Sequence, residues 1–304
     1  MKYSVVICSH NPRADYLTRV LEGLKNQSMP KEKWELLLVD NASTEPLAGA
    51  WDLSWHPQAR HIREETLGLS HARLCAIHHF EGEMLVFIDD DNILASDYLD
   101  VAGQLAEQWP QIGVWSGNVN GEYEVPLEKY WEPFLELLAI RKVTRDRWGN
   151  TGEAAPFGAG MCVRRSVALT YRDQVRNNAA RLGLGRRGDA VLGGEDQDIA
   201  ATSLDFGLGT ALFSGLSLIH LIPQRRLTED YLIKIIRGSE TSYVIENALR
   251  GRNVMPRPSR IDRYVAQYKY YRGTRLQRRI HRARQQAWGD ALAYLAGHGV
   301  KLPE

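Results

Sequence analysis

An apolar run of five residues, 84–88, stops abruptly at three consecutive aspartates, Asp89, Asp90 and Asp91. A short run of this kind is typical of a buried strand that ends at a surface crevice. Adjacent carboxylates repel one another and resist burial unless a cation or hydrogen-bond donors compensate. Hard divalent ions take oxygen ligands and often bring phosphates with them. The run therefore indicates a metal–phosphate site, with a solvated acidic turn as the structural alternative.

Strand-like and helix-like segments alternate over the first 120 residues. The apolar patterns predict strands at 3–9, 34–39, 61–63, 84–88 and 113–116, and helices at 17–24, 68–80 and 97–109. This alternation favours a doubly wound, mostly parallel sheet, although it does not give the strand order. Ligands bind such sheets beyond the carboxyl ends of the strands, and polar residues stand at three of these ends: Ser9 to Asn11, Asp40 and the three aspartates.

The second half of the chain is less regular. We expect a helix at 130–141, a strand within 155–163, a helix that starts near residue 195, strands at 211–213 and 216–222, and an amphipathic helix at 230–249. The predicted organisation is a first domain over residues 1–225 and a C-terminal helical extension over residues 226–304.

Composition limits the partners of the chain. It has 304 residues, 44% of them hydrophobic, and a net charge of +1, which is ordinary for a globular protein and predicts no nucleic-acid partner. The stretch 250–284 is rich in arginine and favours a solvated helical face, with contact to an anionic lipid surface as the alternative. No apolar run approaches the roughly 20 residues that span a bilayer, and no signal peptide is recognisable. We therefore expect a cytoplasmic protein, with peripheral contact to the inner face of the membrane left open. The three cysteines, Cys8, Cys75 and Cys162, show no paired or metal-binding spacing and are expected to stay reduced.

Six short motifs occur in a fixed order along residues 3–225. They are Ser9-His10-Asn11, Asp40-Asn41-Ala42-Ser43, Gly68 to Arg73, Asp89-Asp90-Asp91-Asn92, Gly194-Glu195-Asp196 and a late His220. Each motif is weak alone, but together the chain resembles a family 2 glycosyltransferase with the GT-A fold. The resemblance implies a Rossmann-like α/β fold, a nucleotide-sugar donor, and transfer of the sugar to a hydroxyl with inversion.

For the donor, the resemblance implies that Asp40 accepts a hydrogen bond from the nucleotide base, which suits uracil and hence UDP. Ser9 and Asn11 would flank the same nucleotide. Arg73 would reach the diphosphate, since its forked donors match phosphate oxygens. The structural alternatives are a turn after a strand for Asp40 and a surface position for Arg73. Many relatives carry Asn after this arginine, whereas this chain has Leu74.

For the metal, Asp89 and Asp91 match the first and last acids of the DxD motif. The resemblance implies that Asp91 binds Mn²⁺ or Mg²⁺, and that Asp89 lies nearer the ribose or the donor sugar. Asp90 would contact the sugar or stabilise the turn. His220 would complete the metal site, although a lone histidine after a strand is more often structural.

For catalysis, Glu195 and Asp196 match an acidic pair that precedes a helix in the family. Inverting transfer needs one base that removes the proton of the acceptor hydroxyl. We assign Asp196 as this base and Glu195 as the second candidate. The alternative is a pair of acids that interacts with the helix dipole, which is our expectation for Asp198.

The acceptor side is less defined. Phe157 and Gly158 match a segment that shapes the sugar pocket in relatives, and Trp115 is a candidate for stacking on a sugar ring, although tryptophan is more often a core residue. The acceptor class that the resemblance implies is a glycan or a lipid-linked sugar. The donor sugar and the linkage are not predictable, and a homodimer remains open.

Two other classes compete with this interpretation. A sugar-1-phosphate nucleotidyltransferase also combines a doubly wound sheet with acidic metal ligands, but it usually opens with a glycine-rich phosphate loop. The loop here is 9–13 and contains no glycine. A non-catalytic nucleotide- or carbohydrate-binding protein is expected to have lost some of the acids, which are all present.

Overall fold

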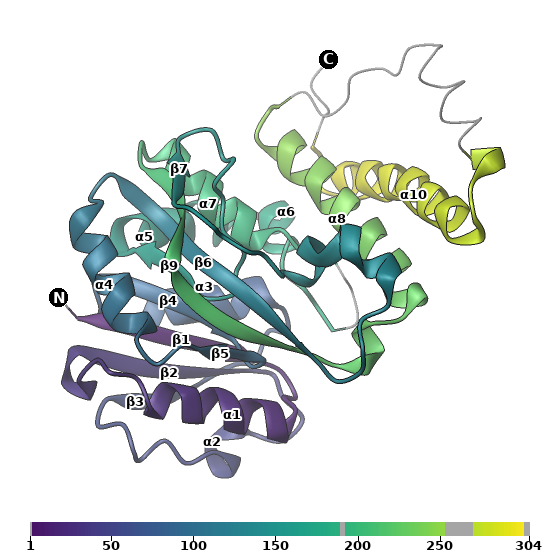
Figure 1. Ribbon diagram of the computed structural model, residues 1–304. Coiled ribbons are helices and arrows are strands. Elements are labelled where there is room, and N and C mark those ends of the chain that lie inside the picture. Colours follow the sequence, from purple (N-terminus) through teal and green to yellow (C-terminus); the bar gives the residue numbers. More distant parts are fainter. Residues whose placement is uncertain (1, 189–191, 253–269, 301–304) are drawn as a thin grey trace.

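The computed structural model describes residues 2–188, 192–252 and 270–300. It is a mixed α/β fold in which one large sheet is followed by two long C-terminal helices (Figure 1). With η marking a 3₁₀ helix, the elements in chain order are β1 (Tyr3–Ser9), α1 (Ala14–Lys25), η1 (Lys31–Lys33), β2 (Trp34–Asn41), α2 (Leu47–Ala50), β3 (Ala59–Glu64), α3 (Leu69–His79), β4 (Met84–Asp89), β5 (Asn92–Leu94), α4 (Tyr98–Gln108), β6 (Ile112–Tyr123), η2 (Lys129–Leu138), β7 (Arg147–Gly149), β8 (Met161–Arg164), α5 (Arg165–Val175), α6 (Ala179–Leu182), α7 (Glu195–Asp205), β9 (Gly209–Ile222), η3 (Gln224–Arg226), α8 (Glu229–Leu249) and α10 (Arg275–Gly297).

The described strands form one sheet in the order β3-β2-β1-β4-β8-β6-β9-β5, and β7 pairs with β9 as well. The first four strands are parallel, and their register places Ser9 beside Asp40 and Cys8 beside Asp89. β8 is antiparallel to both of its neighbours, whereas β6 and β9 run parallel. The predicted mostly parallel sheet is confirmed. In Figure 1, β1 runs from the N-terminus toward the side where the C-terminal helices lie.

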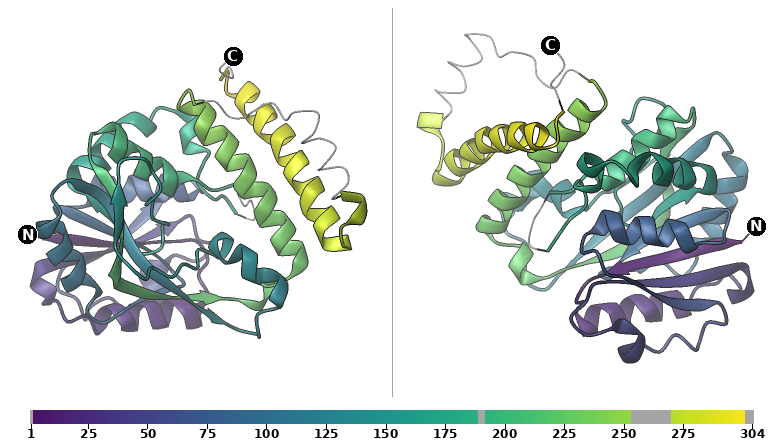
Figure 2. Two further views of the ribbon diagram at one scale, coloured as in Figure 1. Left: turned by 45° about the horizontal axis from the view of Figure 1, so that its top comes forward. Right: turned by 180° about the vertical axis from the view of Figure 1, so that it is seen from behind.

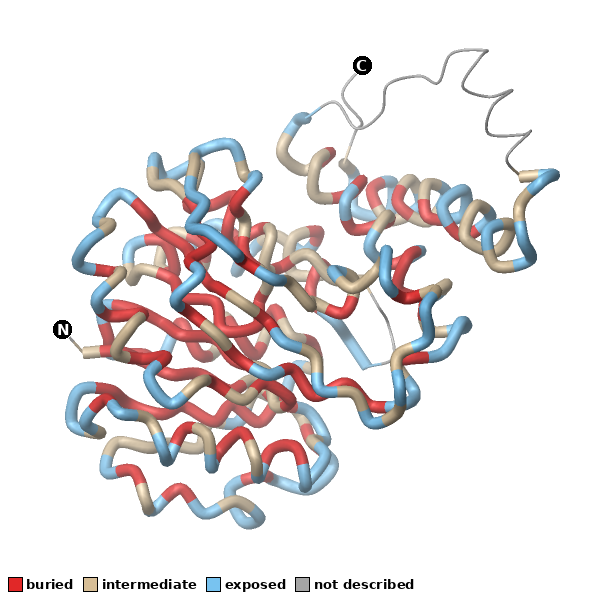
Figure 3. Tube along the Cα trace, in the orientation of Figure 1, coloured by how far each residue is buried: buried red, intermediate tan, exposed pale blue. Residues whose placement is uncertain are grey.

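Alternate residues of the central strands enter two separate cores. Val5 and Ile7 of β1 belong to the cluster that includes the apolar residues of α1 and α4. Val6 belongs to the opposite cluster, with apolar residues of α3, α5 and α7. Because both faces are covered, the strands are continuously apolar, and they form the buried centre in Figure 3.

The structure differs from the sequence-based expectations mostly in the second half. The strands expected at 211–213 and 216–222 are one strand, β9, whose pairing with β6 shifts register between Ser116 and Asn118. The helix expected at 130–141 is the 3₁₀ helix η2, which contains Pro133; proline removes a helical hydrogen bond. The short strands β5 and β7 were not expected. Both are three residues long and are held by pairing with β9.

The C-terminal helices α8 and α10 lie side by side and run in the same direction (Figure 2): Arg279, near the start of α10, pairs with Glu229 at the start of α8, and Thr241, further along α8, donates to the carbonyl of Ala287. α10 presents Ala283, Ala287, Ala291 and Leu295 at intervals of four, so that small side chains on one face allow close approach to α8. This parallel helix pair shares a core with Trp131 of η2, at the end of the sheet.

The helix pair contains part of the arginine-rich stretch. Residues 253–269 of that stretch lie outside the described residues. On α10, Arg279 pairs with Glu229 and Asp230, and Arg284 pairs with Glu240. None of the helices in the described ranges combines the length and the apolar composition that crossing a bilayer requires.

Trp131 packs between the helix pair and the sheet and gives a test of this packing. Its side chain is fully buried, and its indole N–H donates to the carbonyl of Leu227 at 3.0 Å. We expect Trp131→Ala to lower the free energy of unfolding by about 3–5 kcal/mol, because it leaves a large cavity and removes one of the two hydrogen bonds that the Leu227 carbonyl accepts, the other coming from the Tyr130 hydroxyl. Urea denaturation followed by circular dichroism measures this loss. Trp148→Ala is the matched control, since Trp148 is 56% exposed, and an equal loss in both variants would contradict the assignment.

Candidate active site

The acidic run and His220 are brought together by strand pairing. Asp89 ends β4, and Asn92 begins β5, which pairs antiparallel with β9 so that Asn92 lies opposite His220. The backbone N–H of Leu221 donates to the carbonyl of Asp91 at 2.9 Å. The closeness of Asp91 and His220, which are 129 residues apart in the sequence, thus depends on the three-residue strand β5.

Asp91 is surrounded by cationic and polar groups. Its Oδ2 lies 3.4 Å from His220 Nε2 and 3.2 Å from Arg226 Nη1, while the side-chain amide of Asn92 donates to Oδ1 at 2.9 Å. Burial raises the pKa of Asp91, but His220 and Arg226 more than offset this, so the pKa lies well below its usual value. Asp91 is therefore a charged carboxylate in a nearly closed site.

Asp90 experiences the opposite balance. Burial and the neighbouring charge of Asp91 raise the pKa of Asp90 to about 7, although a hydrogen bond from Ser9 opposes the shift. The Ser9 hydroxyl donates to Asp90 Oδ2 at 2.5 Å. Ser9, expected to flank the nucleotide, thus holds the middle acid of the run.

Asp91 and His220 fit a divalent cation. Their facing atoms are 3.4 Å apart, which allows both to bind one ion at metal–ligand distances of about 2.1 Å. An imidazole beside a carboxylate suits Mn²⁺, and His220 Nδ1 is a buried atom without a hydrogen-bond partner among the described residues. In that same part of the chain, no three His, Cys, Asp or Glu side chains converge on one point. The remaining ligands would have to be water and phosphate oxygens, as is common for Mg²⁺.

Arg73 of α3 connects the acidic run to the second acidic pair. Its guanidinium is buried, 3.7 Å from Asp89 and 3.3 Å from Glu195, and 5.1 Å above the ring of Phe87. Its Nη1 has no hydrogen-bond partner in the described chain. Gly158 closes the site from another side, since a Cβ added there would lie 2.5 Å from Arg73 Nη2. Arg73 is therefore an interior residue rather than a surface arginine.

Glu195 and Asp196 form the first turn of α7, after Gly194 with a φ of 146°. Burial raises the pKa of Glu195, and Arg73 partly opposes the shift. Asp196 is less buried; its Oδ2 accepts from the Gly158 N–H at 2.9 Å and its Oδ1 from the Gln197 N–H at 2.8 Å. The structure thus brings together Asp89, Arg73, Gly158, Glu195 and Asp196.

The Asp40 carboxylate accepts hydrogen bonds from the loop that follows it and from Arg63. The backbone N–H groups of Ser43 and Leu47 each donate to it at 3.0 Å, and Arg63 donates at 2.6 Å. Burial raises the pKa of Asp40, and these three donors lower it further than burial raises it, so the net pKa lies below its usual value. Much of the acceptor capacity of this carboxylate is therefore used, and base recognition by Asp40 stays a prediction.

Asn11 belongs to the same pair of loops. It has a φ of 49°, its N–H donates to Ser43 Oγ at 2.9 Å, and its side-chain oxygen accepts from the Thr44 N–H at 2.9 Å. These bonds fasten the loop after β1 to the loop after β2. The side chain of Asn11 is exposed, so it lies at the surface of this loop pair.

The two aromatic candidates differ. Phe157 is half-buried and stacks under the guanidinium of Arg141, with 3.8 Å between Cζ and the ring centroid. Trp115 is 1% exposed and lies in the middle of the sheet, where β6 pairs it with Cys162. Because β6 places the Trp115 side chain in the core, this residue cannot make the expected contact with a sugar ring in this structure.

Sequence reasoning missed two arginines of the site. Arg226 follows His220 by six residues in η3, and only the fold shows that it returns to Asp91. Arg63 stands opposite Asp40 in the parallel register of β2 and β3. The expected strand at 61–63 could have suggested Arg63, whereas Arg226 had no local signal beyond its closeness to His220.

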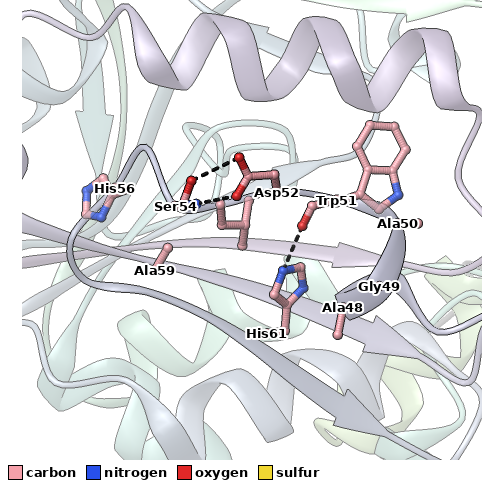
Figure 4. A pocket seen from close by; sticks show the side chains of 10 residues that line it. Ala48, Gly49, Ala50, Trp51, Asp52, Ser54, His56, Ala59 and His61 are labelled. Carbon is pink, nitrogen blue, oxygen red and sulfur yellow. Dashed lines mark hydrogen bonds between the residues drawn. The ribbon is translucent and has the colours of Figure 1, made fainter.

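A hollow of about 560 Å³ lies elsewhere, at the edge of the sheet beside β3. Figure 4 shows that His61 points toward the backbone of Trp51, and its Nε2 donates to the Trp51 carbonyl at 3.0 Å. None of the predicted site residues lines this hollow. It is therefore separate from the acidic site.

Comparison with known proteins identifies the family. The model of "Glycosyl transferase family 2" matches residues 4–171, more than half of the chain. The chain therefore belongs to this family. This membership confirms the resemblance that the sequence motifs indicate.

Two curated relatives match about a third of the chain. The poly(ribitol-phosphate) beta-N-acetylglucosaminyltransferase TarS of Staphylococcus aureus is 25% identical over 111 residues, which are 36% of this chain and 19% of that protein. A poly(ribitol-phosphate) beta-glucosyltransferase of Bacillus spizizenii is 32% identical over 106 residues, 33% of this chain and 16% of that protein. The matched segments thus span less than a fifth of either relative.

Solved structures share the fold over most of the chain. The mannosyltransferase PcManGT of Pyrobaculum calidifontis, in complex with GDP-Man and Mn²⁺, has a TM-score of 0.59 at 18% identity and covers 99% of this chain and 86% of that one. S. aureus TarS 1–349 in complex with UDP has a TM-score of 0.52 at 18% identity, covering 90% and 73%. These similarities confirm the GT-A fold.

Glu246 of α8 gives a test of the electrostatics beside α7. Burial and the charge of Asp198 raise its pKa to about 7, above the unfolded value of 4.5. A raised carboxyl pKa destabilises the folded state increasingly between pH 4.5 and 7, and fully above pH 7. We expect Glu246→Gln to raise the free energy of unfolding by about 1 kcal/mol or more at pH 8, and to have no such effect near pH 4.5. Urea titrations at both pH values measure this; an equal effect at both would contradict the shift.

Proposed function

We propose that this chain is an inverting, metal-dependent glycosyltransferase that moves a sugar from a nucleotide-sugar donor, preferably a UDP-sugar, to a hydroxyl of its acceptor. The observation that carries the proposal is the link made by Arg73, which lies between Asp89 of the first acidic group and Glu195 of the second. The first acidic group, Asp89 to Asp91, has the residues expected of a site for a cation and a diphosphate. The second group, Glu195 and Asp196, contains carboxylates that can accept a proton.

The donor would bind at the first group. Asp91 and His220 would hold Mn²⁺ or Mg²⁺, which when bound neutralises charge on the departing diphosphate. Arg73 and Arg226 carry the forked donors that suit phosphate oxygens. Support comes from the solved relatives, one in complex with GDP-Man and Mn²⁺ and others with UDP or UDP-GlcNAc. Asp40 and Asn11 would lie beside the nucleotide.

The acceptor hydroxyl would be deprotonated at the second group. Asp196 is the more suitable base, because it is more exposed than Glu195 and is not paired with Arg73. As the acceptor oxygen bonds to the anomeric carbon, the bond from that carbon to the diphosphate breaks, and the hydroxyl proton passes to the Asp196 carboxylate. The Gly158 N–H, bonded to Asp196, orients the carboxylate during this transfer.

The acceptor is proposed by class. The names of both curated relatives specify a poly(ribitol-phosphate) acceptor, that is, a polymer with free hydroxyls and phosphate groups. A surface polymer or its lipid-linked precursor is therefore the acceptor class that we favour, with a role in polysaccharide biosynthesis. Transfer would then take place in the cytoplasm, where such precursors are reached from the inner face of the membrane.

Calorimetric titration of UDP and GDP, first with Mn²⁺ and then with EDTA, tests the donor site. We expect UDP to bind only with Mn²⁺, and Asp91→Ala to weaken this binding by about 100-fold or more, since it removes a charged metal ligand. Asp173→Asn, at an exposed acid on α5, is the control and is expected to bind as the wild type does.

Each result of the titration has a defined meaning. Tight binding of GDP instead of UDP would keep a glycosyltransferase and change the donor. Unchanged UDP affinity in Asp91→Ala with Mn²⁺ present would reject the metal role of Asp91. Absence of binding for both nucleotides in the wild type would reject the proposed uridine or guanosine donor.

Asp196→Asn separates binding from chemistry. The amide keeps an acceptor oxygen for the Gly158 N–H but cannot take up a proton, so kcat is expected to fall by about 10²–10⁴-fold while UDP affinity changes by less than about twofold. A radiolabelled UDP-sugar transfer assay, with titration of UDP, provides both quantities. Transfer at the wild-type rate in Asp196→Asn would assign the base elsewhere, with Glu195 as the next candidate.

A further inference from the structure

Helix α8 carries an unusual row of residues on one face. Gly238, Ser242, Glu246 and Arg250 are spaced by four and therefore lie above one another along the helix. Two of them, Ser242 and Arg250, contact the start of α7, which carries Glu195 and Asp196. A helix that only covered the domain would be expected to place an apolar face there.

The first contact is made by Ser242, which is 5% exposed. Its hydroxyl accepts from the Gly193 N–H at 3.0 Å and donates to the Gly238 carbonyl at 2.8 Å. The next residue, Gly194, also lies beside α8, since a Cβ added there would be in van der Waals contact with the Ser242 Cβ at 3.6 Å. The residues just before the acidic pair are thus fixed to α8.

The second contact is made by Arg250. Its Nη2 donates to the Asp198 side chain at 2.6 Å and to the Asp198 carbonyl at 3.0 Å. The other oxygen of this carboxylate accepts from Arg181 at 2.8 Å. Because Asp198 is 2% exposed and both of its oxygens are engaged, the end of the first turn of α7 is also fixed. This pairing agrees with the structural role expected for Asp198.

The two contacts enclose the acidic pair. Gly193 and Asp198 are five residues apart, and Glu195 and Asp196 lie between them. By contrast, Arg237 on the same helix pairs with Asp290 of α10 and does not contact α7 among the described residues. α8 therefore has one set of polar contacts for α7 and another for α10.

We propose that α8 is a positioning element of the active site: Ser242 and Arg250 hold the first turn of α7 so that the carboxylates of Glu195 and Asp196 keep a fixed place. The catalytic part of this inference rests on the proposed function, while the structural part does not. The face of α8 that carries Ser242 and Arg250 would then be required for transfer and not for donor binding, which involves the other acidic group.

Three variants of the full chain test the proposal: Ser242→Ala, Arg250→Gln and the control Arg237→Gln. Hydrogen–deuterium exchange of the peptide that contains 193–198 is measured first, because it does not depend on activity. We expect exchange there to accelerate at least about tenfold in Ser242→Ala and Arg250→Gln, and to stay unchanged in Arg237→Gln. Unchanged exchange in the first two variants would overturn the inference, whatever the protein catalyses.

Kinetics give the second measurement. We expect kcat to fall at least about tenfold in Ser242→Ala and Arg250→Gln, with Mn²⁺-dependent UDP affinity within about twofold of the wild type, and Arg250→Lys to recover part of the loss. Equal losses in Arg237→Gln, or a loss of UDP affinity in parallel with kcat, would indicate general destabilisation and overturn the positioning role. If exchange changes as expected in a protein that transfers no sugar, the structural inference holds and the proposed function fails.

Discussion

The pairing of β5 with β9 is the contact on which the candidate site depends. Without it, Asp91 and His220 would be distant positions at the ends of separate strands, and the acidic run would be a solvated turn. β9 carries His220 and leads into η3, which carries Arg226, so one continuous segment brings an imidazole and a guanidinium to the same carboxylate. The acids follow the parallel strand β4, and the antiparallel pairing of β5 with β9 brings His220 and Arg226 to them.

Buried charge in this site is balanced locally. The buried Arg73 lies between Asp89 and Glu195, and the half-buried Arg226 faces Asp91, so each guanidinium has a carboxylate within 4 Å. Breaking such a buried pair is far more costly than breaking one at the surface, because the remaining charge stays desolvated. This balance explains how several acids remain close together in the free protein. A bound cation would add positive charge to this site, and a bound diphosphate would add negative charge.

The parallel half of the fold was predictable because its signals are local. The apolar runs of β1, β2 and β4 and the polar residues that follow them define strands and their carboxyl ends, and the family resemblance covers these same motifs. The three-residue strands were not predictable, since they pair with β9, which is distant from them in the sequence. Trp115 shows the same limit: its surroundings, and not its type, decide whether it meets a ligand or the core. Arg226 belongs to the site through tertiary structure alone.

The contact between Gly158 and Arg73 has a consequence for sequence variation in related chains. Since a Cβ at position 158 would lie 2.5 Å from the Arg73 guanidinium, and the Gly158 N–H is bonded to Asp196, the backbone there cannot retreat without releasing that bond. A larger residue at 158 would therefore require the Arg73 guanidinium to leave its place between the acids, or a shorter side chain at 73. We expect the two positions to covary, and their joint identity would mark which relatives keep an arginine beside both acidic groups.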